Sequence, residues 1–122
     1  GNDQLPALVA GASIANYLST GEGFGMPIVE AMGLGVPVVA TSGGNLEDAG
    51  GTLARYVAAD DPSHLVTVWR ELLDDSALRC RLGDEGVQHA ARFDRRRLAQ
   101  QLLNIYDAVW QGSPLPANSP PA

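Results

Sequence analysis

The sequence contains no lysine, and all eight of its basic residues are arginine. A Walker-type phosphate-binding loop requires a Gly-Lys-Ser/Thr sequence, so this class of nucleotide site is excluded. Any phosphate bound here must therefore be held by backbone amides, by arginine or by groups outside the chain. With 14 acidic residues the net charge is −6, which argues against nucleic acid as the main partner.

Cysteine, long apolar runs and an N-terminal leader are scarce or missing as well. Cys80 is the single cysteine, so no disulfide can form within the chain, and this favours a reducing compartment, the cytoplasm. No apolar run approaches the roughly 20 residues that span a bilayer, and no charged-then-apolar leader or initiating methionine is present. A start at Gly1 predicts that the chain is a piece of a longer protein.

Residues 1–41 predict a β-α-β unit preceded by a short helix. We expect a helix at Leu5–Ala10 and a strand at 13–18, where β-branched and aromatic residues occur. Pro27 suits the first turn of a second helix, which would end at one of the glycines of 33–35. The nearly continuous apolar run at 36–41 is typical of a strand buried on both faces. Such a unit predicts a parallel sheet with a right-handed crossover.

The second half of the chain predicts a last short strand at 55–57 and then three helices. The first helix begins at Pro62 and carries an apolar stripe, formed by Leu65, Val68, Trp69, Leu72 and Leu73. The second spans about 76–92, with three residues expected to face inward: Leu78, Leu82 and Val87. Asp94 can cap the third helix. Its apolar stripe consists of Leu98, Leu102, Ile105 and Val109.

Two strong strands are too few for a doubly wound sheet, which typically has five or six. The other strands must come from upstream sequence or from another chain. We therefore expect an α/β fold over residues 1–111, with a partial Rossmann-like parallel sheet followed by C-terminal helices. Residues 112–122 contain four prolines and are expected to form a disordered tail.

The most informative segment is the glycine-rich turn between the first strand and the second helix. Glu22 and Glu30 lie eight positions apart, and three glycines stand between them or beside them. Glycine allows positive φ and close approach of a ligand, and open parallel sheets bind ligands beyond the carboxyl ends of their strands. The amides of residues 25–29, together with the helix dipole, favour a phosphate or pyrophosphate.

Two carboxylates beside a pyrophosphate would repel it unless each bonds to neutral hydroxyls instead. An ionised carboxylate only accepts hydrogen bonds, and a vicinal diol offers it two donors. A nucleoside diphosphate sugar has diols at both ends and the pyrophosphate between them. We expect Glu30 in the first helical turn, where the dipole favours an acid. Taken alone, the pattern also fits an ordinary turn followed by a helix with an acid near its start.

The string that begins at Glu22 and ends at Ala40, Glu-Gly-Phe-Gly-x-Pro-x-x-Glu-Ala-Met-x-x-Gly-x-Pro-Val-Val-Ala, resembles the sugar-donor motif of retaining GT-B glycosyltransferases, most closely family 4. The resemblance implies that residues 1–111 are the C-terminal portion of a nucleotide-sugar-binding domain. It implies transfer of a hexose from a nucleotide diphosphate sugar to an acceptor hydroxyl with retention, without a metal or other cofactor. The acceptor domain and the basic residues for the diphosphate would lie upstream, so the fragment alone is expected to be inactive.

The resemblance also assigns roles to individual residues. Glu22 would bond the hydroxyls of the transferred sugar and is the candidate catalytic residue, and Glu30 would hold the ribose diol. The other candidates for binding the sugar donor are Gly23, Phe24, Gly25, Met26, Pro27 and Ile28. The loop at 42–47 resembles the family loop that lies near the nucleotide, although a plain connection is an equally good interpretation.

Two other functions fit the same residues, namely a nucleotide-sugar epimerase of GT-B architecture and a non-catalytic nucleotide-sugar-binding module. The upstream sequence would distinguish an epimerase from a glycosyltransferase, because an epimerase needs a different set of acid and base residues. A dehydrogenase is excluded, because the glycines of 21–25 lack the spacing of a dinucleotide fingerprint.

We expect structural roles for the remaining histidine, acidic and cysteine residues. His64 and His89 are far apart in the sequence, and the acidic pairs at 60–61 and 74–75 suit helix caps rather than a metal site. Cys80 suits a small buried apolar position. The basic run at 95–97 could contact an anionic membrane, although a solvated face or an interdomain contact suits it better, and its place at a helix start favours an acidic partner. We also expect the isolated fragment to self-associate.

Overall fold

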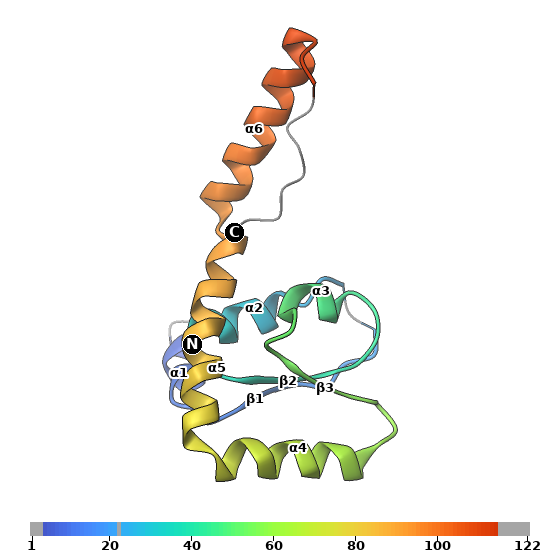
Figure 1. The fold of residues 1–122 in the computed structure, drawn as a ribbon, viewed down its shortest axis with the longest axis vertical. Helices are drawn as coiled ribbons and strands as arrows, with labels where there is room; N and C mark the ends of the chain where they lie inside the picture. Colours follow the sequence, from blue (N-terminus) through green and yellow to red (C-terminus); the bar gives the residue numbers. More distant parts are fainter. Residues whose placement is uncertain (1–3, 22, 115–122) are drawn as a thin grey trace. The chain divides into compact units, whose positions relative to one another are not determined.

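The computed structural model describes residues 4–21 and 23–114 and contains three strands and six α-helices in that part of the chain (Figure 1). In chain order the elements are α1 (Leu5–Ala10), β1 (Ala15–Tyr17), α2 (Met26–Gly33), β2 (Val38–Thr41), α3 (Leu46–Gly50), β3 (Arg55–Val57), α4 (Pro62–Asp74), α5 (Ser76–Ala90), the 3-10 turn η1 (Ala91–Phe93) and α6 (Arg95–Gln111). The chain divides into two compact units, residues 1–90 and 91–122. The Pro-rich residues 115–122 lie outside the described part.

The three strands form one parallel sheet in the order β1-β2-β3, as the sequence predicts for the first two. Asn16 pairs with Val39, and Val39 pairs in turn with Arg55. All four residues of β2 are buried, which explains why its sequence is apolar without alternation. Because the strands are parallel, their carboxyl ends share one side of the sheet, and the loops that follow them leave from that side (Figure 1).

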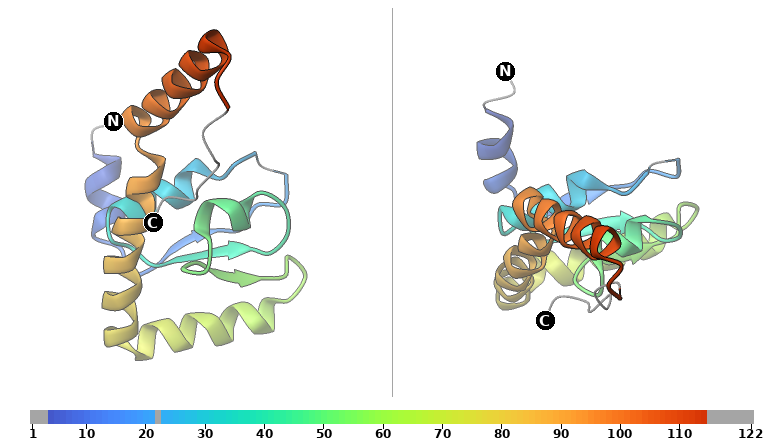
Figure 2. Two further views of the ribbon diagram at one scale, coloured as in Figure 1. Left: turned by 45° about the horizontal axis from the view of Figure 1, so that its top comes forward. Right: turned by 90° about the horizontal axis from the view of Figure 1, so that it is seen from above.

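Helices cover both faces of the sheet. Helices α2 and α3 lie on one face and α4 lies on the other, as Figure 1 and the left view of Figure 2 show. On the α4 face, the buried cluster consists of Val39, Val57, Val68, Leu72, Leu78 and Leu82. The indole Nε1 of Trp69 donates to the Asn16 side-chain oxygen at 2.7 Å, which ties α4 to the edge strand β1.

Charged side chains cap the start of α4 and build the corner between α4 and α5. Asp61 accepts a hydrogen bond from the His64 amide at 2.9 Å, and Asp75 accepts one from the Leu78 amide at 2.8 Å. These contacts confirm that the acidic pairs supply helix caps. Arg79 donates to the Leu72 and Leu73 carbonyls, at 2.6 and 2.7 Å, and so satisfies carbonyls at the end of α4.

Helix α5 packs closely against α2 through glycines. A Cβ added to Gly83 would overlap the carbonyl oxygen of Gly35, whereas a Cβ at Gly86 would lie 3.5 Å from the Met32 Cβ. Two predictions for this helix are wrong: Val87 is 44% exposed, and Cys80 is exposed rather than buried. Cys80 lies two residues from both Leu78 and Leu82, which places it on the opposite side of the helix from those buried leucines.

The second unit consists of η1 and α6. Asp94 caps α6 as predicted, accepting a hydrogen bond from the Arg96 amide at 3.0 Å. The expected stripe is exposed at Leu102, Ile105 and Val109, and the side chain of Leu98 lies outside the described part. The basic run at 95–97 is exposed too. Across residues 4–21 and 23–114, no helix combines the length and the apolar character that a bilayer crossing demands.

Candidate functional site

The turn into α2 depends on Gly25. This buried glycine has φ 82° and ψ 42°, a left-handed conformation that side chains with a Cβ rarely adopt. A Cβ at this position would lie 2.9 Å from the Leu46 Cδ2 atom and 3.3 Å from the Ile28 Cδ1 atom. The glycine therefore serves both the backbone conformation and the contact of the turn with α3.

The first turn of α2 offers fewer free amides than the sequence suggests. The Ile28 amide donates to the Gly25 carbonyl at 2.9 Å, and Pro27 has no N–H. The prediction that the amides of residues 25–29 face a ligand is therefore wrong at Ile28. The Ile28 side chain is buried in the core, whereas Phe24 and Met26 are 40% and 47% exposed.

Glu30 is the fifth residue of α2 and is exposed. No acidic residue lies in the first turn of the helix, so the expectation that the dipole favours Glu30 there is wrong. Its neighbours Ile28 and Val29 take the buried face of the helix, which leaves Glu30 directed outward. Glu22, the other predicted carboxylate, lies outside the described residues.

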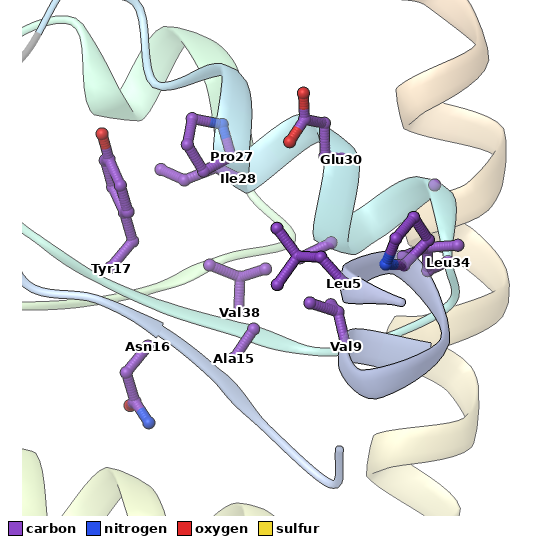
Figure 3. A pocket seen from close by; sticks show the side chains of 13 residues that line it. Leu5, Val9, Ala15, Asn16, Tyr17, Pro27, Ile28, Glu30, Leu34 and Val38 are labelled. Atoms are coloured by element: carbon purple, nitrogen blue, oxygen red, sulfur yellow. The ribbon is translucent and has the colours of Figure 1, made fainter. Parts of the chain in front are cut away.

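Glu30 lies at the rim of a cavity of about 560 Å³ on the α2 face of the sheet. Its walls come from α1, β1, α2 and the start of β2, and most of them are apolar: Leu5, Pro6, Val9, Ala15, Asn16, Tyr17, Pro27, Ile28, Glu30, Ala31, Gly33, Leu34 and Val38. Figure 3 shows the Glu30 carboxylate above the apolar side chains of Leu5, Val9 and Val38. The cavity thus combines an apolar floor with one acidic group at its edge.

A second cavity, of about 330 Å³, lies at the carboxyl ends of the strands. Ser19 and Thr20 follow β1, Thr41 ends β2, and Ala59 follows β3. The loop at 42–46 completes the wall. We call this the hydroxyl-lined cavity, because four of its residues carry a hydroxyl group: Ser19, Thr20, Thr41 and Ser42. Sequence reasoning did not name Ser19, Thr20 or Thr41 as site residues, although each lies at or just after the end of a predicted strand, whereas Ser42 belongs to the loop at 42–47 that resembles the family loop near the nucleotide.

Two hydrogen bonds hold the start of the loop at 42–46. The Ser42 amide donates to the Val57 carbonyl at 2.8 Å, and the Gly43 amide donates to Oε1 of Glu47 at 3.0 Å. Gly43 and Gly44 have φ 99° and 73°, and a Cβ at either would meet nothing within 4 Å. The loop lines the cavity, and space is open where a side chain would stand at Gly43 and Gly44.

Two further polar side chains support α3 beside this loop. The Tyr56 hydroxyl donates to the Gly51 carbonyl at 3.0 Å. Burial, with additional repulsion from Glu47 and Asp48, raises the pKa of Tyr56 to about 12, so the phenol is neutral at physiological pH. The His89 ring nitrogen Nε2 lies 2.8 Å from the Ala49 carbonyl oxygen, which connects α5 to α3. Both residues act in packing, and within the described residues no group of three potential metal ligands occurs.

These features define the class of the protein: a Rossmann-like parallel α/β fold with a glycine turn and a hydroxyl-lined cavity at the carboxyl ends of its strands. Residues 2–75 match the family model described as glycosyl transferases group 1. The match covers more than half of the chain, and the chain belongs to this family. The resemblance noted in the sequence is thereby confirmed at the level of the glycosyltransferase family.

Similar proteins carry glycosyltransferase names. An MMP alpha-(1->4)-mannosyltransferase of Mycolicibacterium hassiacum is 37% identical over 110 residues, which cover 87% of this chain and 27% of the relative. D-inositol 3-phosphate glycosyltransferases of Corynebacterium kroppenstedtii and Streptomyces avermitilis are each 34% identical over 113 residues. Those matches cover 90% and 91% of this chain, and 25% and 24% of the relatives. The chain thus spans about a quarter of the length of the curated relatives it matches.

Proposed function

We propose that this chain is the sugar-donor-binding part of a retaining GT-B glycosyltransferase of family 4. The whole enzyme transfers a hexose from a nucleotide diphosphate sugar to an acceptor hydroxyl. Membership of the glycosyltransferase family supports this assignment, as do the sugar-transfer names of the relatives. The observation that carries it is the outward Glu30 carboxylate, beside a glycine turn at the carboxyl ends of parallel strands.

The proposed roles follow the chemistry of the sugar donor. Glu30 accepts two hydrogen bonds from the ribose diol, and Glu22 accepts them from the transferred sugar. Backbone amides of Gly23, Phe24 and Gly25 face the diphosphate, and Met26 and Pro27 form the entry to the helix beside it. The hydroxyl-lined cavity adds neutral groups that bind phosphate or sugar oxygens without adding positive charge, which suits a chain with few basic residues.

The rest of the catalytic machinery is proposed to come from sequence outside these 122 residues. That sequence supplies the acceptor-binding domain and the basic groups that neutralise the diphosphate. We propose the cytoplasm as the location, supported by the single cysteine of this chain. Contact of the whole enzyme with a membrane surface remains a proposal based on the exposed basic run at 95–97.

The role of Glu30 is testable in the full-length protein that contains this chain. Replacing Glu30 with Ala removes the acceptor for both ribose hydroxyls, and we expect nucleoside diphosphate binding to weaken by about 1–3 kcal/mol. Isothermal titration calorimetry with uridine, guanosine and adenosine diphosphates measures this loss. Glu85→Ala, which removes an exposed acid from α5, is the control and should leave affinity unchanged.

Two results would contradict the proposal. Unchanged affinity of the Glu30→Ala protein would remove Glu30 from the ribose site. A wild-type protein that binds none of the nucleoside diphosphates at millimolar concentration would overturn the proposed function itself. Transfer of a labelled sugar to an acceptor then separates a glycosyltransferase from a module that only binds.

A further inference from the structure

Thr41 is a buried polar residue at the carboxyl end of the central strand β2. Its side chain is 4% exposed, and it is the only polar residue in the buried core of the part that the structure describes. Within residues 4–21 and 23–114 its hydroxyl has no hydrogen-bond partner. A buried hydroxyl without a partner is unfavourable, and a valine would fill the same space without that cost. The presence of threonine at this position therefore calls for an explanation.

The Thr41 hydroxyl opens into a small cavity. Thr41 lies two residues after Val39 on the same strand, so both side chains are on the α4 face of the sheet. There Thr41 lines a cavity of about 190 Å³, which we call the Thr41 cavity. Among the described residues, the one side-chain nitrogen or oxygen atom that is sealed without a partner is Nε of Arg55. The Thr41 oxygen is thus unpartnered but not sealed, and the cavity is what it faces.

The walls of the Thr41 cavity suit an uncharged ligand. Leu18, Val57 and Leu65 make them mainly apolar, and the described residues of the lining include no basic side chain. The acid of the lining, Asp61, caps α4 by accepting a hydrogen bond from the His64 amide. An acid without a neighbouring base disfavours phosphate, whereas apolar walls with a few hydroxyl groups match the C–H face and the hydroxyls of a sugar.

The size of the Thr41 cavity indicates that it receives one part of a ligand. Its volume is below the roughly 300–1,000 Å³ of pockets that enclose a whole ligand. It adjoins the hydroxyl-lined cavity, because Thr20, Thr41 and Ala59 line both. Thr20 directly precedes the glycine turn. A sugar bound at this turn therefore lies within reach of both cavities.

We propose that Thr41 is a specificity-determining residue, whose hydroxyl exchanges a hydrogen bond with one hydroxyl group of the transferred sugar. This inference rests on the proposed function, which places that sugar at the glycine turn. Thr41 pairs with Val57 in the sheet, and the Ser42 amide donates to the Val57 carbonyl at 2.8 Å, so the hydroxyl is held on a rigid strand. A fixed hydroxyl discriminates between sugars that present a partner at that place and sugars that do not.

A substitution that keeps the shape and removes the hydroxyl tests this role in the full-length protein. We expect Thr41→Val to bind the nucleotide sugar about three to ten times more weakly, and to bind the nucleoside diphosphate without the sugar as before. Thr41→Ser keeps the hydroxyl and should restore most of the affinity. Calorimetry with uridine-diphosphate glucose, guanosine-diphosphate mannose and adenosine-diphosphate glucose, each beside its nucleoside diphosphate, measures the difference.

Thr67→Val is the matched control. Thr67 is exposed on α4, its hydroxyl donates to the Ser63 carbonyl, and it lines neither cavity. We expect less than a twofold change for every ligand. Urea unfolding checks the fold of each variant, and Thr41→Ala removes the same hydroxyl if valine does not fit.

Sugar analogues that lack one hydroxyl at a time identify the partner of Thr41. For one such analogue we expect the wild type to lose affinity and Thr41→Val to lose no more, because the hydrogen bond is already absent. Equal affinity of the wild type and Thr41→Val for the nucleotide sugar overturns the role of Thr41. Equal losses with and without the sugar also overturn it, since they show a structural effect.

One further result would overturn the role of Thr41 in binding the transferred sugar. A raised KM for the acceptor, with affinity for the nucleotide sugar unchanged, would give the cavity to the acceptor instead. Failure of the wild type to bind any nucleoside diphosphate or nucleotide sugar has a different meaning, because it overturns the proposed function itself.

Discussion

At the residue scale, Gly25 illustrates how one position can satisfy two requirements. It sits in the left-handed region at the start of α2, and its missing side chain makes room for Leu46 and Ile28. The first requirement is a matter of local backbone geometry, whereas the second depends on a residue 21 positions away. Glycine meets both, so the turn that carries the predicted site is also part of the packing between α2 and α3.

Gly25→Ala should therefore destabilise the protein. The strained φ and the close contact with Leu46 together should cost about 2–3 kcal/mol, measured as a lower urea midpoint with an unchanged slope. Gly21→Ala is the control, because a Cβ at Gly21 would meet nothing within 4 Å. A Gly25→Ala protein as stable as the control would mean that the turn relaxes easily and that its geometry is not fixed by Gly25.

The second residue-scale prediction concerns Glu22. If it contacts only the transferred sugar, Glu22→Ala should lower kcat/KM by roughly 100-fold or more while binding of the free nucleoside diphosphate changes little. The reason is that charge develops at the sugar in the transition state and not at the ribose. Steady-state kinetics and calorimetry on the same preparation measure both effects. Normal turnover, or equal losses for sugar-bearing and sugar-free nucleotides, would refute this role.

At the element scale, α5 contributes Leu78 and Leu82 to the core and approaches the end of α2 through two glycines. Gly83 faces the Gly35 carbonyl, and Gly86 faces Met32. The backbone of α5 therefore contacts the backbone of the α2–β2 turn at Gly83. Any residue with a side chain at position 83 would hold the helix farther from this turn. Val87, which the sequence predicted on the inner face, is 44% exposed.

The two glycines should respond differently to the same substitution. Gly83→Ala places a Cβ against a rigid carbonyl, and we expect a loss of about 1–3 kcal/mol despite the better helix propensity of alanine. Gly86→Ala makes only ordinary van der Waals contacts with Met32, so the gain in propensity should stabilise the protein by up to about 1 kcal/mol. Urea unfolding of both variants tests the pair, and similar effects of the two substitutions would contradict the close approach of α5.

At the scale of the whole molecule, the described sheet has β1 at one edge and a large apolar cavity beside it. Leu5 and Leu8 of α1 are 56% and 74% exposed near this edge. Parallel sheets are normally covered and paired, so such an edge favours association with another strand and helix. The proposed partner in the whole enzyme is the upstream sequence, and in the isolated chain it is a second copy.

We therefore expect the isolated 122 residues to self-associate at micromolar concentration in sedimentation velocity experiments. Leu34→Glu, which introduces a charge into the apolar cavity wall, should weaken the association. Val66→Glu on α4 is the control, because Val66 is similarly exposed but does not line the cavity. A compact monomer with a cooperative melt would show that three strands suffice and that the cavity needs no partner.

Local patterns in the sequence determined most of the elements. The apolar run at 36–41 predicted the central strand, Asp61 and Asp94 predicted helix starts, and the string that begins at Glu22 predicted the glycosyltransferase family. These features depend on neighbours within a few residues, or on a motif that is itself contiguous. A single sequence therefore records them directly.

The tertiary structure decided the features that depend on residues far apart in the chain. The hydroxyl-lined cavity joins residues that follow three different strands, and the Gly43–Glu47 contact depends on how the loop folds back onto α3. Leu78 and Leu82 take the inner face of α5, so Cys80 lies on the outer face and is exposed. The apolar character of cysteine alone predicted a buried position. Composition and spacing give each residue a preference, but only the packing of one element on another determines which side chains reach the core and which face the site.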